Sequence, residues 1–253
     1  MSEQPDALLA PRWLVTVDDN DRVLTDHVVA IADGRILAIE DRDSATRRWP
    51  DVAVTEYRDH ALMPGLINAH THAAMNLFRG LADDLPLGEW LQQHIWPAEG
   101  QWVDEAFVGD GTELALAEMV AGGITCFNDM YFFPEVTARV AAERGVRAVI
   151  GMILLDFPTQ YADGPDQYLD KGLALHDRYR DHPLVQTAFA PHAPYTVSDA
   201  PLERVRTYAD ELERPVHIHV HETAAECGDA QDQHGERPLA RLERLGLLSP
   251  ALA

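Results

Sequence analysis

The sequence predicts an α/β protein in which a small antiparallel sheet precedes a larger parallel one. Two observations support this fold class. Up to about residue 60 the chain is made of short segments rich in valine and isoleucine, and from residue 61 strand-like apolar segments alternate with helical segments. Alternation of strands and helices favours a parallel sheet whose strands are joined by helices. We therefore expect two domains, residues 1–60 and residues 61–253.

Four short strands are expected in the first domain, with polar turns between them. Asp33 and Gly34 make one of these turns, and this dipeptide favours a two-residue hairpin because both residues tolerate a left-handed backbone. We expect the strands to form part of an antiparallel sheet. They are Trp13–Val17, Val28–Ala32, Arg35–Ile39 and Val52–Tyr57.

The second domain is expected to contain five strands that alternate with helices. The third strand is almost wholly apolar, as is typical of a strand covered on both faces. The strands are a short one through Leu66 and Ile67, then Ile124–Met130, Arg147–Leu155, Val185–Ala190 and Pro215–His221. The helical segments are Leu77–Gly80, Leu87–Ile95, Asp104–Val120, Pro134–Arg144, Gln167–Tyr179, a helix through Leu212 capped by Ser198 or Asp199, Thr223–Gln233 and Arg237–Leu245.

Five strand–helix units are fewer than the eight of a closed barrel. The chain ends after its last expected helix without a polar tail. We therefore expect a (β/α)8 barrel that is cut off after about five strands and has an open edge at the fifth. On that expectation the 253-residue chain alone is not a competent catalyst, because closure of a barrel brings the first and fifth strands across from each other.

The composition excludes several classes of function. With 20 basic and 42 acidic residues the net charge is −22, so the protein should repel nucleic acid and anionic membranes. No apolar run approaches the ~20 residues of a membrane span, and the acidic amino terminus is unlike a signal peptide. Cys126 and Cys227 cannot form a disulfide framework and are expected to be reduced thiols. We expect a cytoplasmic protein.

A pair of histidines follows the first strand of the second domain, in the stretch M-P-G-L-I-N-A-H-T-H from Met63 to His72. Side chains two residues apart on a strand point the same way, so His70 and His72 should project together from the carboxyl end of the strand. Two imidazole nitrogens so placed can hold one metal ion. Histidines at this spacing also arise by chance, and motifs further along the chain decide between the two interpretations.

The fifth strand reads H-I-H-V-H-E, from His217 to Glu222. An imidazole on a metal ion, with a carboxylate three residues further on, is the arrangement that metal-assisted hydrolysis needs. We assign His219 as the metal ligand and Glu222 as the acid/base. His217, one layer deeper, and His221, near the rim, are interpreted as core residues or residues that support the ligands.

The fourth strand ends in A-P-H-A-P-Y, from Ala190 to Tyr195. Two prolines around His192 make a stiff turn that should aim the imidazole into the mouth of the sheet, where a functional role is favoured over a structural one. This strand offers no lysine, and Lys171, the sole lysine of the chain, falls in an expected helix. A carbamylated lysine that bridges two metals is therefore disfavoured, and one metal ion is expected.

Together these motifs resemble the amidohydrolase superfamily, and above all its 5-methylthioadenosine/S-adenosylhomocysteine deaminases, which also resemble triazine chlorohydrolases. The resemblance covers essentially the whole chain. Further stretches that carry it are A-A-M-N-L-F-R-G-L-A-D-D-L-P-L after His72, W-P-A-E at 96–99, G-G-I-T-C-F-N-D-M at 122–130 and H-V-H-E-T at 219–223.

The resemblance implies a (β/α)8 TIM-type barrel, truncated here, with a partial amino-terminal β-sandwich and one divalent metal ion, usually zinc. It implies that Glu222 shuttles protons, that His192 contacts the substrate and the water at the metal, and that Glu99 binds the ribose hydroxyls of a nucleoside. Self-association of the full-length form into a homo-oligomer is left open. The implied metal ligands are His70, His72 and His219.

The chain departs from that family in two places. The fourth metal ligand, an aspartate from the eighth strand, has no counterpart, and the loop from Leu154 to Gln167 lacks the arginine that some members use for the homocysteine carboxylate. The resemblance implies hydrolytic deamination of methylthioadenosine or S-adenosylhomocysteine with release of ammonia, and leaves the choice between them open. Two alternatives stand beside it: an amidohydrolase that acts on another amino- or chloro-substituted heterocycle, such as guanine, cytosine or a triazine, and an inactive fragment.

Overall fold

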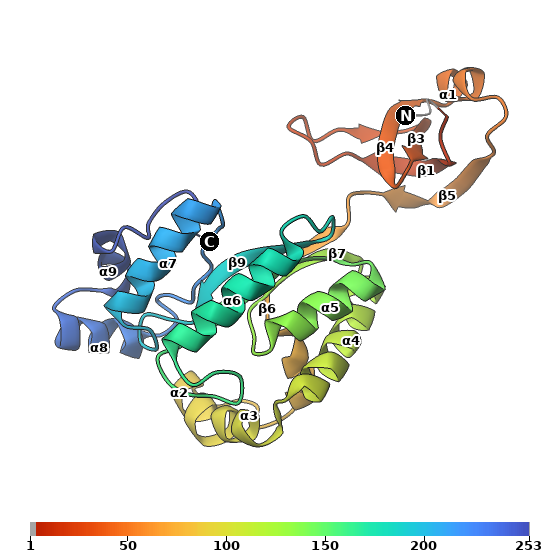
Figure 1. Cartoon of the computed structure of the whole chain (residues 1–253). Helices are drawn as coiled ribbons and strands as arrows, with labels where there is room; N and C mark the ends of the chain where they lie inside the picture. Colours follow the sequence, from red (N-terminus) through yellow and green to blue (C-terminus); the bar gives the residue numbers. More distant parts are fainter. Residues whose placement is uncertain (1–3, 253) are drawn as a thin grey trace. The chain divides into compact units, whose positions relative to one another are not determined.

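A computed structural model describes residues 4–252 of the chain, which adopt an α/β fold. The chain divides into two compact units, one up to Gly65 and one from Leu66 onward (Figure 1). Each unit has a hydrophobic core of its own. The first is a small sheet with one helix, and the second is a parallel sheet with the remaining helices.

The first unit contains a five-stranded sheet in which four strands follow the order β2-β1-β3-β4 and β5 also pairs with β1. Its core is built from apolar side chains of β1 and β3, together with two residues at the helix, Ala45 and Trp49. The elements are β1 (Ala7–Val15), β2 (Val23–Leu24), β3 (His27–Ala32), β4 (Arg35–Asp41), α1 (Arg42–Arg48) and β5 (Val54–Leu62).

The predicted hairpin turn between β3 and β4 is confirmed. Asp33 and Gly34 have φ of 51° and 71°, which is the left-handed pair that a tight hairpin requires. The expected antiparallel pairing holds for β1 with β2, β1 with β3 and β3 with β4, but it is wrong for β5, which runs parallel to β1. Helix α1, which was not expected from the sequence, explains the difference. It connects β4 to β5 and so allows these two consecutive strands to run in the same direction, that of β1.

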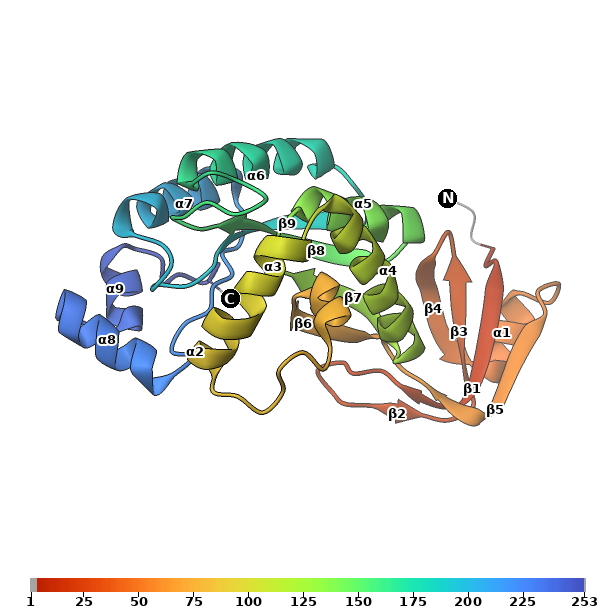
Figure 2. The same cartoon turned by 90° about the horizontal axis from the view of Figure 1, so that it is seen from below.

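The second unit is built on four parallel strands whose order in the sheet, β6-β7-β8-β9, is their order in the chain. This confirms the first four strands expected there. Helices α5, α6 and α7 lie on the same side of the sheet (Figure 2). The strands are β6 (Leu66–Thr71), β7 (Ile124–Asp129), β8 (Arg147–Leu154) and β9 (Val185–Pro191). The helices are η1 (Ala73–Phe78), α2 (Leu87–Glu89), η2 (Trp90–Ile95), α3 (Trp96–Trp102), α4 (Glu105–Ala121), α5 (Pro134–Arg144), α6 (Pro165–Tyr179), α7 (Asp199–Leu212), α8 (Ala224–His234) and α9 (Pro238–Arg244).

Local signals account for several of these helix ends. Helix α4 begins directly after Asp104, whose carboxylate accepts the backbone N–H of Phe107 at 2.8 Å, and α5 ends at Gly145, which has φ of 71°.

The segment from residue 87 differs from the prediction. Instead of one helix that stops at Ile95, α2, a π-helical turn and α3 follow one another up to Trp102.

The expected fifth strand, Pro215–His221, is not a regular strand. Phe189 donates its N–H to the Pro215 carbonyl at 2.9 Å, and His217 donates to the Phe189 carbonyl at 2.8 Å, but this pairing amounts to a single parallel bridge at Val216. The next donor of a parallel ladder would be the N–H of Pro191, and proline has none. The segment therefore lies beside β9 without forming a continuous ladder.

Helix α4 approaches η1 very closely at Gly111. A Cβ placed on Gly111 would lie 2.5 Å from the carbonyl oxygen of Ala74 and 2.8 Å from its Cα. These are backbone atoms of the turn that directly follows His72. At Gly109, in the same helix, a Cβ would meet only a Val136 methyl group at 3.7 Å, which is an ordinary contact.

Substitution of these two glycines by alanine should therefore change the free energy of unfolding in opposite directions or leave it unchanged at Gly109. Gly111→Ala should lower the free energy of unfolding by about 1–3 kcal/mol, because the new methyl group must displace backbone. Gly109→Ala should leave it unchanged or raise it by up to about 1 kcal/mol, because alanine is the better helix former. Urea unfolding of both variants measures this, and equal effects would contradict the close approach of α4 to η1.

Candidate active site

Three histidines from distant parts of the chain converge at the carboxyl ends of the strands. His70 and His72 come from the end of β6, and His219 comes from the segment beside β9. One ligand atom of each lies within 4.8 Å of those of the other two. The ring centroids of His70 are 4.8 Å from His72 and 4.7 Å from His219. The structure thus brings together the three residues expected as metal ligands.

The second nitrogen of two of these rings has a partner that orients it. His72 donates Nδ1–H to the Met130 carbonyl, which leaves Nε2 as its ligand atom. Nδ1 of His70 lies 2.7 Å from Nε2 of His217. His217, interpreted from the sequence as a core or supporting residue, therefore contacts the cluster directly. Residues two apart on an extended segment face the same side, so the spacing of His217 and His219 is the sequence feature that indicates this contact.

Burial favours the neutral form of these imidazoles. Together with the neighbouring imidazoles, it lowers the pKa of His72 and of His219 to about 4. Burial also lowers the pKa of His70, against the charge of Glu222. A neutral imidazole offers a lone pair, and three of them at this spacing fit a zinc ion, which takes nitrogen ligands at about 2.0–2.1 Å. The residues therefore suit the expected metal, while their role as ligands stays a prediction.

His192 stands at the end of β9, beside this cluster. Its ring centroid is 5.3 Å from that of His219, and its backbone carbonyl accepts the N–H of His219 at 3.1 Å. Its Nδ1 lies 2.9 Å from the hydroxyl oxygen of Thr196, whose own proton is donated to the Ala193 carbonyl. His192 therefore donates from Nδ1 and keeps a lone pair on Nε2. Burial lowers its pKa to about 3.

Glu222 follows the His219 segment and is held at both its backbone and its side chain. The buried carboxylate of Glu226 accepts the backbone N–H of His221 at 3.1 Å and that of Glu222 at 2.6 Å. The hydroxyl of Tyr195 donates to Oε2 of Glu222 at 3.1 Å. His221 adopts φ of 58° in this turn and does not line the cavity described below.

Glu99 lies in α3, and its Oε1 accepts a hydrogen bond from the Tyr131 hydroxyl at 2.8 Å. Burial raises the pKa of Glu99 to about 7, against the hydrogen bond from Tyr131, which favours the charged form. A partly buried carboxyl with a single protein partner retains acceptor capacity for a ligand. Tyr131 and Tyr195 are not recognisable as site residues from the sequence, because tyrosines carry no spacing signal of their own.

One cavity of about 290 Å³ connects these groups. It is lined by five of the six residues proposed from the sequence, and the sixth, His70, contacts two of them. Large apolar side chains make up much of the remaining wall. The five are His72, Glu99, His192, His219 and Glu222, and the apolar residues include Met75, Trp90, Trp96, Phe132, Ile153 and Phe157. Lys171 lies elsewhere, with its ammonium over the Tyr161 ring.

Solved structures with the same fold include several hydrolases. A zinc-bound adenosine deaminase from Xanthomonas campestris is 50% identical, with a TM-score of 0.94 over the whole of this chain and 57% of that one. An atrazine chlorohydrolase from Arthrobacter aurescens, complexed with zinc, is 21% identical with a TM-score of 0.88, over 97% of this chain and 59% of that one. The likeness to the second concerns the fold alone.

Curated relatives match over almost the whole chain but are longer than it. A 5-methylthioadenosine/S-adenosylhomocysteine deaminase from Saccharophagus degradans is 52% identical over 97% of this chain and 55% of its own length. A deaminase of the same name from Thermodesulfovibrio yellowstonii is 42% identical over 95% of this chain and 55% of its own length. The chain therefore spans about half the length of these relatives. The model of the amidohydrolase family matches residues 61–253, and the chain belongs to that family.

Proposed function

We propose that the protein is a zinc-dependent hydrolase that deaminates the adenine ring of adenosine thioethers, methylthioadenosine or S-adenosylhomocysteine. The observation that carries the proposal is the shared cavity, in which the histidine cluster, His192 and Glu222 meet a second carboxyl, the partly buried one of Glu99. The names of the deaminase relatives at 42–52% identity and the zinc in the Xanthomonas structure support it.

The metal would be held by the three imidazoles, in an α/β barrel of the type that the family implies. When bound, zinc supplies Lewis acidity that lowers the pKa of a water molecule toward about 7. No lysine lies near the cluster among the described residues, which supports one ion rather than a carbamate-bridged pair. The ligands we propose are His70, His72 and His219.

Glu222 is the proposed proton shuttle. Its carboxylate takes a proton from the water and delivers it to ring N1, which makes C6 susceptible to attack by hydroxide. It then takes the proton of the new hydroxyl on C6 and passes it to the amine, so that the C6 oxygen becomes a carbonyl, one water is consumed and one ammonia is released. Tyr195 holds one oxygen of Glu222, and His192 offers the Nε2 lone pair to a proton of the water or substrate.

Glu99 is the proposed ribose-binding residue. Its carboxylate, oriented by Tyr131, can accept hydrogen bonds from the two hydroxyls of a ribose. The apolar wall of the cavity suits a purine face and an uncharged thioether. A free base such as guanine or cytosine has no ribose hydroxyl for Glu99 to bind. The role of Glu99 therefore distinguishes a nucleoside deaminase from the alternative, an amidohydrolase that acts on a free heterocycle.

The other proposed properties concern partners and location. Among residues 4–252, no helix combines the length and the apolar character that crossing a bilayer needs. A small nucleoside is the proposed partner, and neither nucleic acid nor a membrane is proposed as one because the net charge is −22. Self-association and a cytoplasmic location stay predictions from the sequence.

The inactive-fragment alternative has a direct assay. The zinc-loaded 253-residue chain is incubated with methylthioadenosine, and conversion to the inosine product is followed by ultraviolet absorbance. Turnover excludes the fragment alternative, and zinc binding without turnover supports it. In that second case the kinetic predictions below are measured on the chain continued by the remaining part of the Saccharophagus relative, which is 52% identical.

Zinc binding tests the histidine cluster without any turnover. The chain should bind about one zinc ion, and His219→Ala should weaken its affinity by roughly 10²-fold or more, because one of three nitrogen ligands is lost. His60→Ala, which removes an exposed histidine of β5, is the matched control and should bind zinc as tightly as the parent. Competition with a chromophoric chelator measures both affinities. Equal affinity of the two variants would refute the ligand assignment.

Glu222→Gln should separate binding from catalysis. The amide keeps the shape of the side chain but cannot accept the proton of the water, so kcat should fall by roughly 10²-fold or more. Zinc affinity and the KM for methylthioadenosine should change little. Near-normal kcat in a zinc-loaded variant would show that another group moves the proton.

Glu99→Ala should discriminate between nucleoside and free-base substrates. Loss of a charged hydrogen bond to the ribose, worth about 1.5–3 kcal/mol, should lower kcat/KM for methylthioadenosine by ~10–100-fold. Activity on free adenine or guanine should not fall with it. Glu89→Ala, at an exposed carboxylate of α2, controls for the loss of charge. Equal losses on nucleoside and base would favour the free-base alternative.

A further inference from the structure

The loop between β9 and α7, residues 192–198, contributes three residues to the cavity wall but has no regular secondary structure. His192 and Tyr195 both line the cavity, and Tyr195 donates its hydroxyl to Glu222. A buried loop must find partners for its backbone carbonyls outside a sheet or helix. Its last residue, Ser198, is held separately, because its N–H is donated to Asp156 at 2.8 Å.

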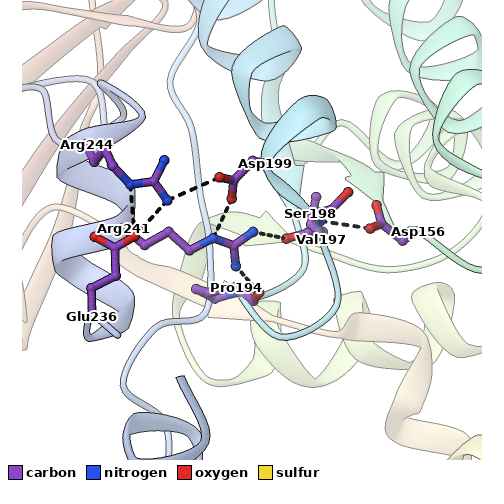
Figure 3. Close-up of polar contacts among 8 residues, drawn as sticks. All are labelled: Asp156, Pro194, Val197, Ser198, Asp199, Glu236, Arg241 and Arg244. Atoms are coloured by element: carbon purple, nitrogen blue, oxygen red, sulfur yellow. Dashed lines mark hydrogen bonds and ion pairs between the residues drawn. The ribbon is translucent and has the colours of Figure 1, made fainter. Parts of the chain in front are cut away.

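The middle of this loop is held by one buried arginine from another helix. Arg241 of α9 donates from Nη1 to the Pro194 carbonyl at 2.5 Å and from Nη2 to the Val197 carbonyl at 3.0 Å. Its Nε donates to Oδ1 of Asp199, the first residue of α7, at 2.7 Å. Figure 3 shows the guanidinium between these three acceptors. The two carbonyls flank Tyr195 and Thr196, so the arginine spans the part of the loop that carries the tyrosine.

Only an arginine can make this set of contacts. Its planar fork presents three nitrogens in fixed directions, whereas a lysine ammonium at the same place is a single point donor. The side chain of Arg241 is 5% exposed, so a lost bond is not replaced by water at low cost. The carboxylate of Asp199 balances the buried charge.

A neighbouring arginine provides the natural comparison. Arg244, also on the last turn of α9, pairs with the same Asp199 at 3.1 Å and with Glu236 at 2.7 Å. It is 49% exposed and has no hydrogen bond to a carbonyl of the loop. Arg244 therefore shares the charge environment of Arg241 but not its contacts with residues 194–197 (Figure 3).

We propose that Arg241 is a positioning residue, which fixes the loop from Pro194 to Val197 and thereby the placement of Tyr195 on Glu222 and of His192 on Thr196. The catalytic consequence rests on the proposed deaminase function. The positioning itself does not, because order in the loop can be measured without turnover. Nothing in the chemistry of the reaction requires Arg241 to touch the substrate.

Hydrogen–deuterium exchange on the intact chain is the first test, read by mass spectrometry over residues 193–198. Arg241→Met, which keeps the length of the side chain, should accelerate exchange there by roughly 10- to 100-fold, the effect of losing charge-assisted hydrogen bonds. Arg241→Lys should accelerate exchange nearly as much, because a positive charge without the planar fork of arginine cannot bind both carbonyls. Arg244→Met is the matched control and should match the parent. Peptides of β7 and β8 should exchange alike in all four proteins.

Turnover provides the second test. In the active enzyme, Arg241→Met should lower kcat by roughly 10-fold at unchanged zinc affinity, and Tyr195→Phe should add little to it, because the two act through one contact. If Arg241→Met does not fold, Arg241→Lys carries both tests. Unchanged loop exchange overturns the proposal, and so does faster exchange with unaltered kcat. Absence of turnover in the parent is a failure of the proposed function alone, and the exchange result still decides whether Arg241 orders the loop.

Discussion

Parallel pairing is the constraint on which the candidate site depends, because it makes the carboxyl ends of β6 to β9 meet at one edge of the sheet. His70 and His219 are far apart in the chain, yet their rings lie 4.7 Å apart. Two backbone hydrogen bonds between Phe189 and the 215–217 segment set the register that places His219 there. A shift of that segment by one residue would turn His219 away, since alternate residues face opposite sides.

Burial supplies the chemistry that this geometry needs. Removing an imidazole from water penalises its charged form, so His72, His192 and His219 are neutral at physiological pH and each keeps a lone pair. The remaining nitrogen of His72 and of His192 is bound to a carbonyl or hydroxyl of the protein, which determines the tautomer. The same burial acts in the opposite direction on Glu99, whose pKa it raises. Burial thus favours the neutral form both of the proposed metal ligands and of the Glu99 carboxyl in a single cavity.

Much of this arrangement follows from sequence patterns, and the exceptions have physical reasons. Alternating strands and helices, together with histidines at strand ends, predict the parallel sheet and the convergence of His70, His72 and His219. The irregular fifth strand could not be predicted from apolar content, because the ladder is interrupted by Pro191 of the neighbouring strand. Contacts such as that of Tyr131 with Glu99 join residues from different helices and loops, and a sequence pattern records only residues of one element.

Beyond the end of the backbone ladder between β9 and the 215–217 segment, charged side chains bind the backbone groups that the ladder leaves unpaired. The turn at Glu222 is held by the carboxylate of Glu226, which accepts two successive backbone N–H groups, and the loop after His192 is held by the guanidinium of Arg241, which donates to two carbonyls. Both anchors are buried, and both come from helices that follow the sheet, α8 and α9. A carboxylate is a pure acceptor and a guanidinium a pure donor, so each suits the kind of backbone group that its loop leaves unpaired. Helices α8 and α9 contribute no residue to the cavity wall but are needed for its geometry, because side chains on irregular backbone are only as well placed as the contacts that hold that backbone.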